Sequence, residues 1–149
     1  MVSGRISAVC SSAERGVSKR DQGSGYLEEN YGLREDAHAG PGERQVSILL
    51  EQFLEPVIEK LGQRPDPGCF AENLLVSGLP ESGIERGALL RAGEAVIRIT
   101  AIGKNLADGH RYSYKGFSLL AERGLFGRVI RGGWVEKGDV VELIEGEPF

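Results

Sequence analysis

Short apolar runs that alternate with polar residues recur along the chain, and glycine-containing turns separate them. In the run AVIRIT, Ile97 and Ile99 fall on one face of an extended segment, while Arg98 and Thr100 fall on the other. Such patterns predict strands over residues 4–10, 45–49, 74–76, 89–91, 95–101, 126–131 and 140–144. This many short strands predicts a mostly-β, barrel-like fold.

One longer segment follows helical rather than strand periodicity. Its apolar residues recur at intervals of three and four, at Leu50, Phe53, Leu54, Val57, Ile58 and Leu61. Pro56 lies inside this pattern, so it should kink or split the helix unless it opens a second helix at its first turn. Gly62 is expected to end the helix. A helical turn is also predicted over 117–122, so the barrel should carry one main helix with helical and loop insertions.

The remaining segments lack a clear period and are predicted as loops. Residues 11–25 are polar and rich in Ser and Gly, which predicts one long loop, followed by an extended segment over 26–33. Residues 103–114 are predicted as a second polar loop. The pair Gly132 and Gly133 is predicted to form a turn after the strand 126–131.

Composition and charge narrow the class of protein. The chain has 149 residues, which predicts a single domain over 1–149 with its core at about 4–144. A net charge of −4 disfavours a nucleic-acid surface, although a local basic patch can still hold a small anion. No apolar run reaches the roughly 20 residues that span a bilayer, and no secretory signal is recognisable. Two cysteines form neither a disulfide framework nor a CxxC motif, so a cytoplasmic protein with free thiols is expected.

The stretch 34–50 carries the densest candidate chemistry. Asp36 and His38 precede a Gly-Pro-Gly turn, and Arg44 and Gln45 stand at the start of an apolar run. Acidic, imidazole and guanidinium groups on a loop before a buried strand are a common layout for a functional site, although a solvated loop shares this pattern. His38 is a candidate general acid/base or anion contact. A metal site needs three or four ligands and is not predicted, and His110 is expected to be a solvated loop residue.

Other candidates lie outside this stretch. Cys69, in the turn PGCFAEN, can be read as a nucleophile or as a structural thiol, and Cys10 as a small buried hydrophobe. Asn73, after Glu72, can satisfy a local turn or read a heteroaromatic edge with its amide. Five basic residues are candidate phosphate contacts, with a plain surface charge as the alternative for each: Lys19, Arg44, Arg98, Lys104 and Arg128.

Several motifs in order along the chain resemble one known family. They are DAHAG and RQVSIL (36–49), PGCFAENLLVSGL (67–79), LLRAGEAVIRIT with AIGK (89–104) and GLFGRVIRGGWVEKGDVVEL (124–143). Together they resemble the MOSC family, named after the C-terminal domain of molybdenum cofactor sulfurases, over roughly residues 4–144. The resemblance implies a β-barrel domain that binds molybdopterin-type cofactors and handles sulfur or metal for molybdoenzymes.

The family's motif residues map onto specific positions of this chain. Lys19 matches an early lysine approximately, and Asp36 and His38 match a D-x-H loop. Arg44 and Gln45 match the family's RQV motif. Glu72 and Asn73 match its ENL motif, and Phe70 before them also fits. Arg128 falls in the family's R-V segment.

Three positions depart from the family pattern. Glu35 and Ala71 stand where the family often has glycine, and Leu106 stands near where a cysteine is usual after the Gly-Lys pair. Because leucine can neither hold a persulfide nor ligate molybdenum, the chain resembles a binding or delivery domain more than a sulfur-transfer catalyst. A pyridoxal phosphate lysine belongs to a separate domain of the full-length sulfurases and is not expected here.

The resemblance implies a specific arrangement of ligand and site. A pterin-pyranophosphate, the molybdenum cofactor or its metal-free form, is expected to bind with its phosphate on Arg44 and on Lys19 or Arg98. Asn73 and Glu72 are expected to meet the pterin edge. Asp36 and His38 are expected to line the same pocket, as catalytic residues if any chemistry occurs.

Two other functions stay open at this point. One is a small enzyme that acts on an anionic sulfur or nitrogen compound through His38 and a cysteine. The other is an interaction module for a molybdoenzyme or a cofactor-biosynthesis protein. No nucleic-acid or membrane partner is expected.

Overall fold

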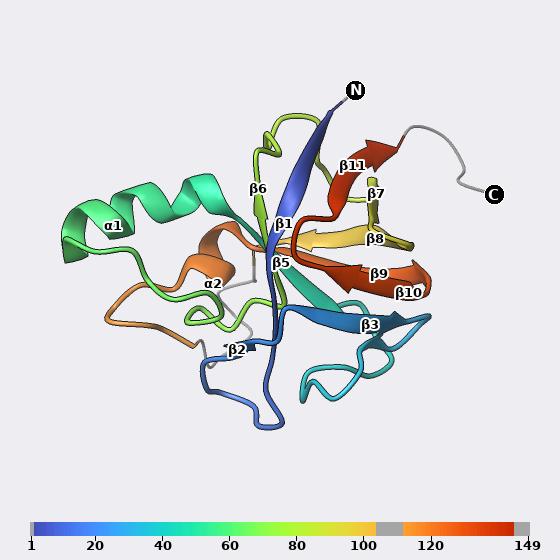
Figure 1. Cartoon of the computed structure of the whole chain (residues 1–149), viewed down its shortest axis with the longest axis horizontal. Helices are drawn as coiled ribbons and strands as arrows, with labels where there is room; N and C mark the ends of the chain where they lie inside the picture. The colour runs from blue at the N-terminus through green and yellow to red at the C-terminus, as the bar shows by residue number, and fades with distance from the viewer. Residues whose placement is uncertain (1, 104–111, 145–149) are drawn as a thin grey trace.

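The structure, a computed structural model, describes residues 2–103 and 112–144. Seven strands form a barrel in the order β11-β7-β8-β9-β5-β6-β1, which closes because β1 also pairs with β11 (Figure 1). These strands are β1 (Ser3–Ser11), β5 (Val46–Leu50), β6 (Leu74–Ser77), β7 (Leu89–Ala92), β8 (Ala95–Ile102), β9 (Leu125–Arg131) and β11 (Val140–Ile144). The predicted mostly-β barrel is therefore confirmed, and each predicted strand lies within one or two residues of an observed one.

Three short strands form a second sheet, and a fourth short strand pairs with the end of β1. The second sheet has the order β10-β3-β4 and consists of β3 (Ser24–Glu28), β4 (Gly32–Leu33) and β10 (Gly133–Glu136). Strand β2 (Arg20–Asp21) pairs with the end of β1. The prediction of a single loop over 11–25 is therefore wrong for its second half. Short strands of polar residues leave no periodic signal, and here they are formed by pairing with β1 and β10.

The predicted turn at Gly132 and Gly133 is also wrong. Gly133 begins β10 and pairs with Leu27 of β3. A Cβ atom on Gly133 would lie 2.7 Å from the Cβ of Glu94. This glycine therefore allows β10 to pack closely against the β7–β8 turn, a role that does not require the chain to reverse at that point.

The main helical region lies between two parallel strands. β5 and β6 pair in parallel, and parallel strands need a crossover, which the 3-10 helix η1 (Glu51–Leu54) and the helix α1 (Glu55–Leu61) provide. Pro56 occupies the first turn of α1, so it opens a second helix, and Gly62 ends it with a φ of 74°. The short helix α2 (Leu119–Arg123) precedes β9 and lies on the same side of the barrel as α1 (Figure 1).

Strand β5 separates two hydrophobic clusters. Val46, Ile48 and Leu50 belong to the cluster inside the barrel, whereas Leu49 belongs to a second cluster between the barrel wall and the helices. Both faces of β5 are thus covered, which explains why all five of its residues are buried. Ser47 lies on the same face of β5 as Leu49, outside the barrel. This polar residue lines the candidate site described below. No described helix has the length and apolar character needed to cross a bilayer.

Candidate functional site

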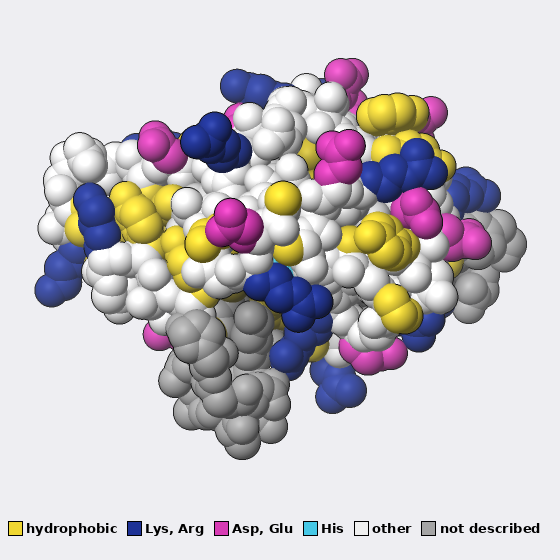
Figure 2. Space-filling model, turned by 90° about the horizontal axis from the view of Figure 1, so that it is seen from below, with side chains coloured by type: hydrophobic (Ala, Val, Ile, Leu, Met, Phe, Trp, Pro, Cys, Tyr) yellow, Lys and Arg dark blue, Asp and Glu magenta, His cyan; other side chains and the backbone are white. Residues whose placement is uncertain are grey.

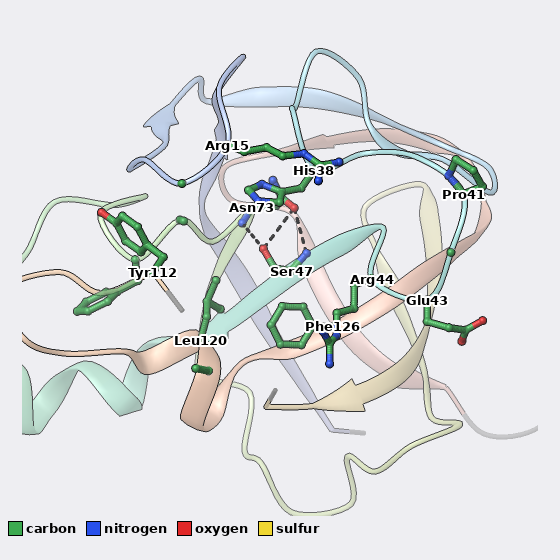
Figure 3. A pocket seen from close by; sticks show the side chains of 15 residues that line it. Arg15, His38, Pro41, Glu43, Arg44, Ser47, Asn73, Tyr112, Leu120 and Phe126 are labelled. Atoms are coloured by element: carbon green, nitrogen blue, oxygen red, sulfur yellow. Dashed lines mark hydrogen bonds between the residues drawn. The ribbon is translucent and has the colours of Figure 1, made fainter. Parts of the chain in front are cut away.

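A cavity of about 570 Å³ lies on the outer face of β5, between that strand and the loops at one end of the barrel (Figure 3). Besides β5, five segments contribute its walls: the loop after β1, the loop before β5, the turn before β6, α2 with the segment leading into it, and β9. The lining residues are Arg15, Gly16, His38, Pro41, Gly42, Glu43, Arg44, Ser47, Phe70, Ala71, Asn73, Tyr112, Leu120, Ala121 and Phe126. Its size is typical of small-molecule sites.

Asn73 and Ser47 form the polar floor of this cavity. Asn73 Oδ1 accepts from the backbone N–H of Ser47 at 3.0 Å and from its hydroxyl at 3.3 Å, and the hydroxyl accepts from the Asn73 N–H at 3.0 Å (Figure 3). Asn73 Nδ2 donates to the carbonyl of Cys10 at 3.1 Å. This side chain therefore ties β1 and β5 to the turn that leads into β6, and one of its two amide hydrogens is used within the protein.

Cationic and imidazole groups from two loops line the cavity. Arg15 comes from the loop after β1, and its Nε donates to the Ala37 carbonyl at 3.2 Å. His38 and Arg44 come from the loop before β5, and the Arg44 guanidinium lies 5.6 Å from the ring centre of Phe126. Lys and Arg side chains also gather near the middle of the face seen in Figure 2. Glu43 is the one carboxylate among the described residues that line the cavity, so the cavity favours an anionic ligand.

Aromatic rings complete the walls. Phe70 and Phe126 line the cavity from the turn before β6 and from β9, and Phe70 makes an edge-to-face contact with Tyr114 at 5.5 Å. The Tyr112 hydroxyl donates to the Cys69 carbonyl at 2.8 Å, and burial raises the pKa of this phenol above its usual range. Apolar faces beside guanidinium groups suit a flat, charged molecule.

A buried ion pair lies directly behind His38. The ammonium of Lys19 is 2.7 Å from Asp36 Oδ1 and 3.0 Å from His38 Nδ1. Asp36 also accepts from the backbone N–H groups of Ser12 at 3.1 Å and His38 at 3.3 Å. The structure therefore brings Lys19, Asp36 and His38 together, but only His38 lines the cavity. Lys19 was expected to contact phosphate, whereas here its side chain is buried against a carboxylate and an imidazole.

Gln45 and Glu72 are buried structural residues in this fold. Gln45 donates to Asn30 Oδ1 at 2.9 Å and accepts from the N–H of Val129 at 3.0 Å. The Glu72 carboxylate accepts from the N–H groups of Gly68 and Phe70 at 2.9 and 3.2 Å, and burial raises its pKa. Neither side chain lines the cavity, because each points into the protein and accepts hydrogen bonds from buried backbone N–H groups there.

Arg98 and Arg128 also lie outside the cavity wall. They face each other across β8 and β9, and Arg98 reaches the carbonyl of Gly87 at 3.4 Å. Arg128 contacts Asn30 Oδ1 at 2.8 Å and Glu43 Oε1 at 3.3 Å. Since Glu43 lines the cavity, Arg128 supports its rim without facing its interior.

Both thiols are buried and poorly suited to nucleophilic chemistry. Cys10 and Cys69 are free, and burial, with a smaller contribution from the Glu72 carboxylate, raises the pKa of both. The value for Cys69 is about 12. The expectation that Cys10 is a small buried hydrophobe agrees with its complete burial. Within residues 2–103 and 112–144, no three His, Cys, Asp or Glu side chains gather as a metal site. Lys104, Leu106 and His110 lie outside the described residues.

Two of the departures from the family pattern have a backbone explanation. Glu35 and Ala71 adopt φ values of 71° and 66°, in the left-handed region where glycine is favoured. The chain thus keeps a glycine-type backbone at both positions with an L side chain in place. Both positions adjoin site residues: Glu35 precedes Asp36, and Ala71 lines the cavity.

Sequence reasoning did not single out Arg15, Ser47, Tyr112 or Phe126 as site residues. Ser47 gave a usable signal, because it is the polar residue in the otherwise apolar strand VSILL. Arg15 and Tyr112 stand in irregular segments. Phe126 lies in a strand where an apolar residue indicates only a core position. Their convergence depends on how the loops meet over β5.

Comparison with known proteins adds two findings. The model of the MOSC domain matches residues 35–142 of the chain. No curated protein matches the chain significantly.

Solved structures share the fold at low sequence identity. The YuaD protein from Bacillus subtilis has a TM-score of 0.75 and 17% identity, with 95% of each chain covered. YiiM from Geobacillus stearothermophilus has a TM-score of 0.65 and 17% identity, covering 95% of this chain and 73% of that one. YiiM from Escherichia coli has a TM-score of 0.60 and 23% identity, covering 96% of this chain and 71% of that one. At these identities the likeness establishes the fold.

Proposed function

The chain belongs to the MOSC domain family, and we propose that its cavity over β5 binds a molybdopterin-type pterin phosphate for maturation or delivery of the molybdenum cofactor. The observation that carries the proposal is that Arg15, His38 and Arg44 all line one aromatic-walled cavity of about 570 Å³. These residues come from two separate loops, so their meeting is a product of the fold.

The residues present fit the parts of such a ligand. Arg44 and Arg15 offer guanidinium groups, which meet phosphate with paired, charge-assisted hydrogen bonds. The rings of Phe70 and Phe126 offer apolar surface for a flat bicyclic ring. Asn73, with one amide hydrogen beyond its bond to Cys10, offers a donor to a polar ring edge.

Binding and delivery are favoured over sulfur transfer. A sulfur carrier needs an accessible thiolate, and Cys10 and Cys69 are buried with raised pKa values. The same observation weighs against an enzyme that attacks a small anion through His38 and a cysteine. The proposed partners are a pterin phosphate and a molybdoenzyme or cofactor-biosynthesis protein that receives it.

Analysis of the purified protein tests the proposal. The protein would be purified from cells that make the cofactor, and pterin released by denaturation would be measured by fluorescence after oxidation and by mass. We expect bound pterin with the wild type and little with Arg44→Ala. Arg86→Ala is the matched control, because Arg86 is exposed in the loop before β7. If the wild type carries no pterin and takes up none when a pterin phosphate is added, the proposal is wrong.

A further inference from the structure

Lys19 is a buried cation held between an acid and an imidazole. The residue is 4% exposed, and the side chains of Lys19 and Asp36 are 1% and 0% exposed. Removing two charges from water is costly, and well-packed apolar residues of similar volume are often at least as stable as a buried ion pair. Its geometry therefore points to a role beyond stability.

The contact between Lys19 and His38 determines which imidazole nitrogen carries hydrogen. A lysine ammonium has three N–H donors and no acceptor, and its nitrogen lies 3.0 Å from His38 Nδ1. Nδ1 must therefore accept, which leaves the ring hydrogen on Nε2. The ring is then neutral, because an imidazolium would carry hydrogen on both nitrogens and place Nδ1–H against an ammonium.

This arrangement differs from the acid–histidine pair of hydrolases. In that pair a carboxylate touches Nδ1–H and stabilises the imidazolium that forms during proton transfer. Here the Lys19 ammonium contacts both groups, with the Asp36 carboxylate at 2.7 Å and His38 Nδ1 at 3.0 Å. Among the described residues, the other charged groups around the site are Arg15 on the loop after β1, Glu43 and Arg44 on the loop before β5, and the buried Glu72, whose carboxylate interacts electrostatically with Lys19.

We propose that Lys19, fixed by Asp36, is a positioning residue that holds His38 as the neutral Nε2–H tautomer, so that His38 takes part in binding and not in general-base catalysis through Nδ1. The inference deepens the proposed function and rests on it only for the identity of the bound ligand. It also gives Lys19 a role different from the phosphate contact expected from the motif.

The backbone around Lys19 is built to hold it in place. The Lys19 N–H donates to the carbonyl of Gly68 at 2.8 Å. Gly68 has a φ of 86°, and a Cβ there would lie 2.2 Å from the Lys19 carbonyl oxygen. Only glycine permits this approach, so the turn before β6 and the loop after β1 meet at a fixed distance. The ammonium is thereby aimed at Asp36 and His38.

Nitrogen NMR of the imidazole rings tests the proposal without any ligand. The chain has two histidines, so a His110→Gln variant leaves His38 as the only ring signal. We expect an unprotonated Nδ1 and a protonated Nε2 at pH 7 and still at pH 6. In Lys19→Met, which removes the donor, the two tautomers should mix. At pH 6 a larger share of His38 should then carry hydrogen on both ring nitrogens than in the wild type, because the repelling ammonium is gone while the Asp36 carboxylate remains.

Two further variants and a binding assay separate the possible outcomes. Lys19→Arg keeps a donor-only cation and should retain the wild-type tautomer even if Lys19→Met fails to fold. Binding of pterin-6-carboxylate, chosen because its carboxylate does not titrate between pH 6 and 7, should be equal at both values for the wild type and should change in Lys19→Met. A protonated Nδ1 in the wild type, or an unchanged tautomer in a folded Lys19→Met, would overturn the inference. Absence of binding with the expected tautomer would count against the proposed function alone.

Discussion

Replacing Asn73 by alanine should destabilise the fold strongly, because its amide connects β1 and β5 to the start of β6. The amide accepts from the Ser47 N–H at 3.0 Å and donates to the Cys10 carbonyl at 3.1 Å. Asn73 is 1% exposed and Ser47 is 8% exposed, so water does not replace these bonds easily. Each buried group left without its partner costs roughly 1–3 kcal/mol.

The expected size of the effect follows from these two bonds. Two groups at a middle value of about 2 kcal/mol each give a loss of about 4 kcal/mol in the free energy of unfolding. For a chain of this length each kcal/mol lowers the melting temperature by about 2–4 °C, so Asn73→Ala should melt about 8–16 °C below the wild type.

The assay is thermal and urea unfolding followed by circular dichroism, with Asn73→Asp as a second variant. Aspartate keeps an oxygen for the Ser47 N–H, but it turns a carboxylate oxygen toward the Cys10 carbonyl in a buried site, so this variant should also unfold well below the wild type. If Asn73→Ala unfolds like the wild type while losing pterin affinity, the amide is a ligand contact alone and the structural reasoning is wrong.

Three further predictions follow from the described residues. Arg44→Ala should weaken pterin-phosphate binding by about tenfold to a hundredfold, with Arg44→Lys in between, because loss of a charge-assisted hydrogen bond costs roughly 1.5–3 kcal/mol. Isothermal titration calorimetry of variants with an unchanged melting temperature measures this effect. Equal affinity for all three proteins would remove Arg44 from the site. The free energy of unfolding should fall as pH rises from 9.0 toward 12, because the Cys69 thiol ionises in the unfolded chain near its ordinary pKa of 9.0 but in the folded protein only at about 12. Urea titrations of the wild type and Cys69→Ala across this range should show a steeper loss for the wild type, and parallel curves would contradict it. Ala71→Gly should leave the free energy of unfolding unchanged or raise it by up to about 1 kcal/mol, since it relieves a positive φ. Gly68→Ala should lower it markedly, because the added Cβ would collide with the Lys19 backbone. Thermal unfolding of both variants and the wild type measures the two effects, and a lower melting temperature for Ala71→Gly would contradict the first.

The local pattern of the sequence determined the barrel class and most of its elements. Alternation over 95–101 placed Ile97 and Ile99 inside, and both are buried in the barrel cluster. Pro56 and Gly62 marked the start and end of a helix through their own backbone preferences, which act within one turn. These features depend on neighbours close in the chain, so they can be read without the fold. The motifs likewise pointed to the MOSC family, which the match over residues 35–142 confirms.

The tertiary structure decided which of the candidate residues share a site. His38, Arg44 and Asn73 stood out in the sequence on separate turns, and only the pairing of β5 with β6 and β9 brings them to one cavity. Gln45 and Glu72 stand beside Arg44 and Asn73 in the same motifs, yet their side chains turn into the protein. Adjacent residues of an extended chain point in opposite directions, so a motif match cannot tell a cavity residue from its buried neighbour.

Lys19 is a second residue whose surroundings could not be predicted from the sequence, because its burial depends on the fold. In the sequence it is a cation in a polar, glycine-containing segment, the usual setting of a solvated side chain. In the fold, the turn at Gly68 packs against its backbone, and Asp36 and His38 close around its ammonium. Burial of a charged group is settled by contacts between segments distant in sequence. Composition and periodicity describe neighbours that are close in sequence, so they carry no information about those contacts.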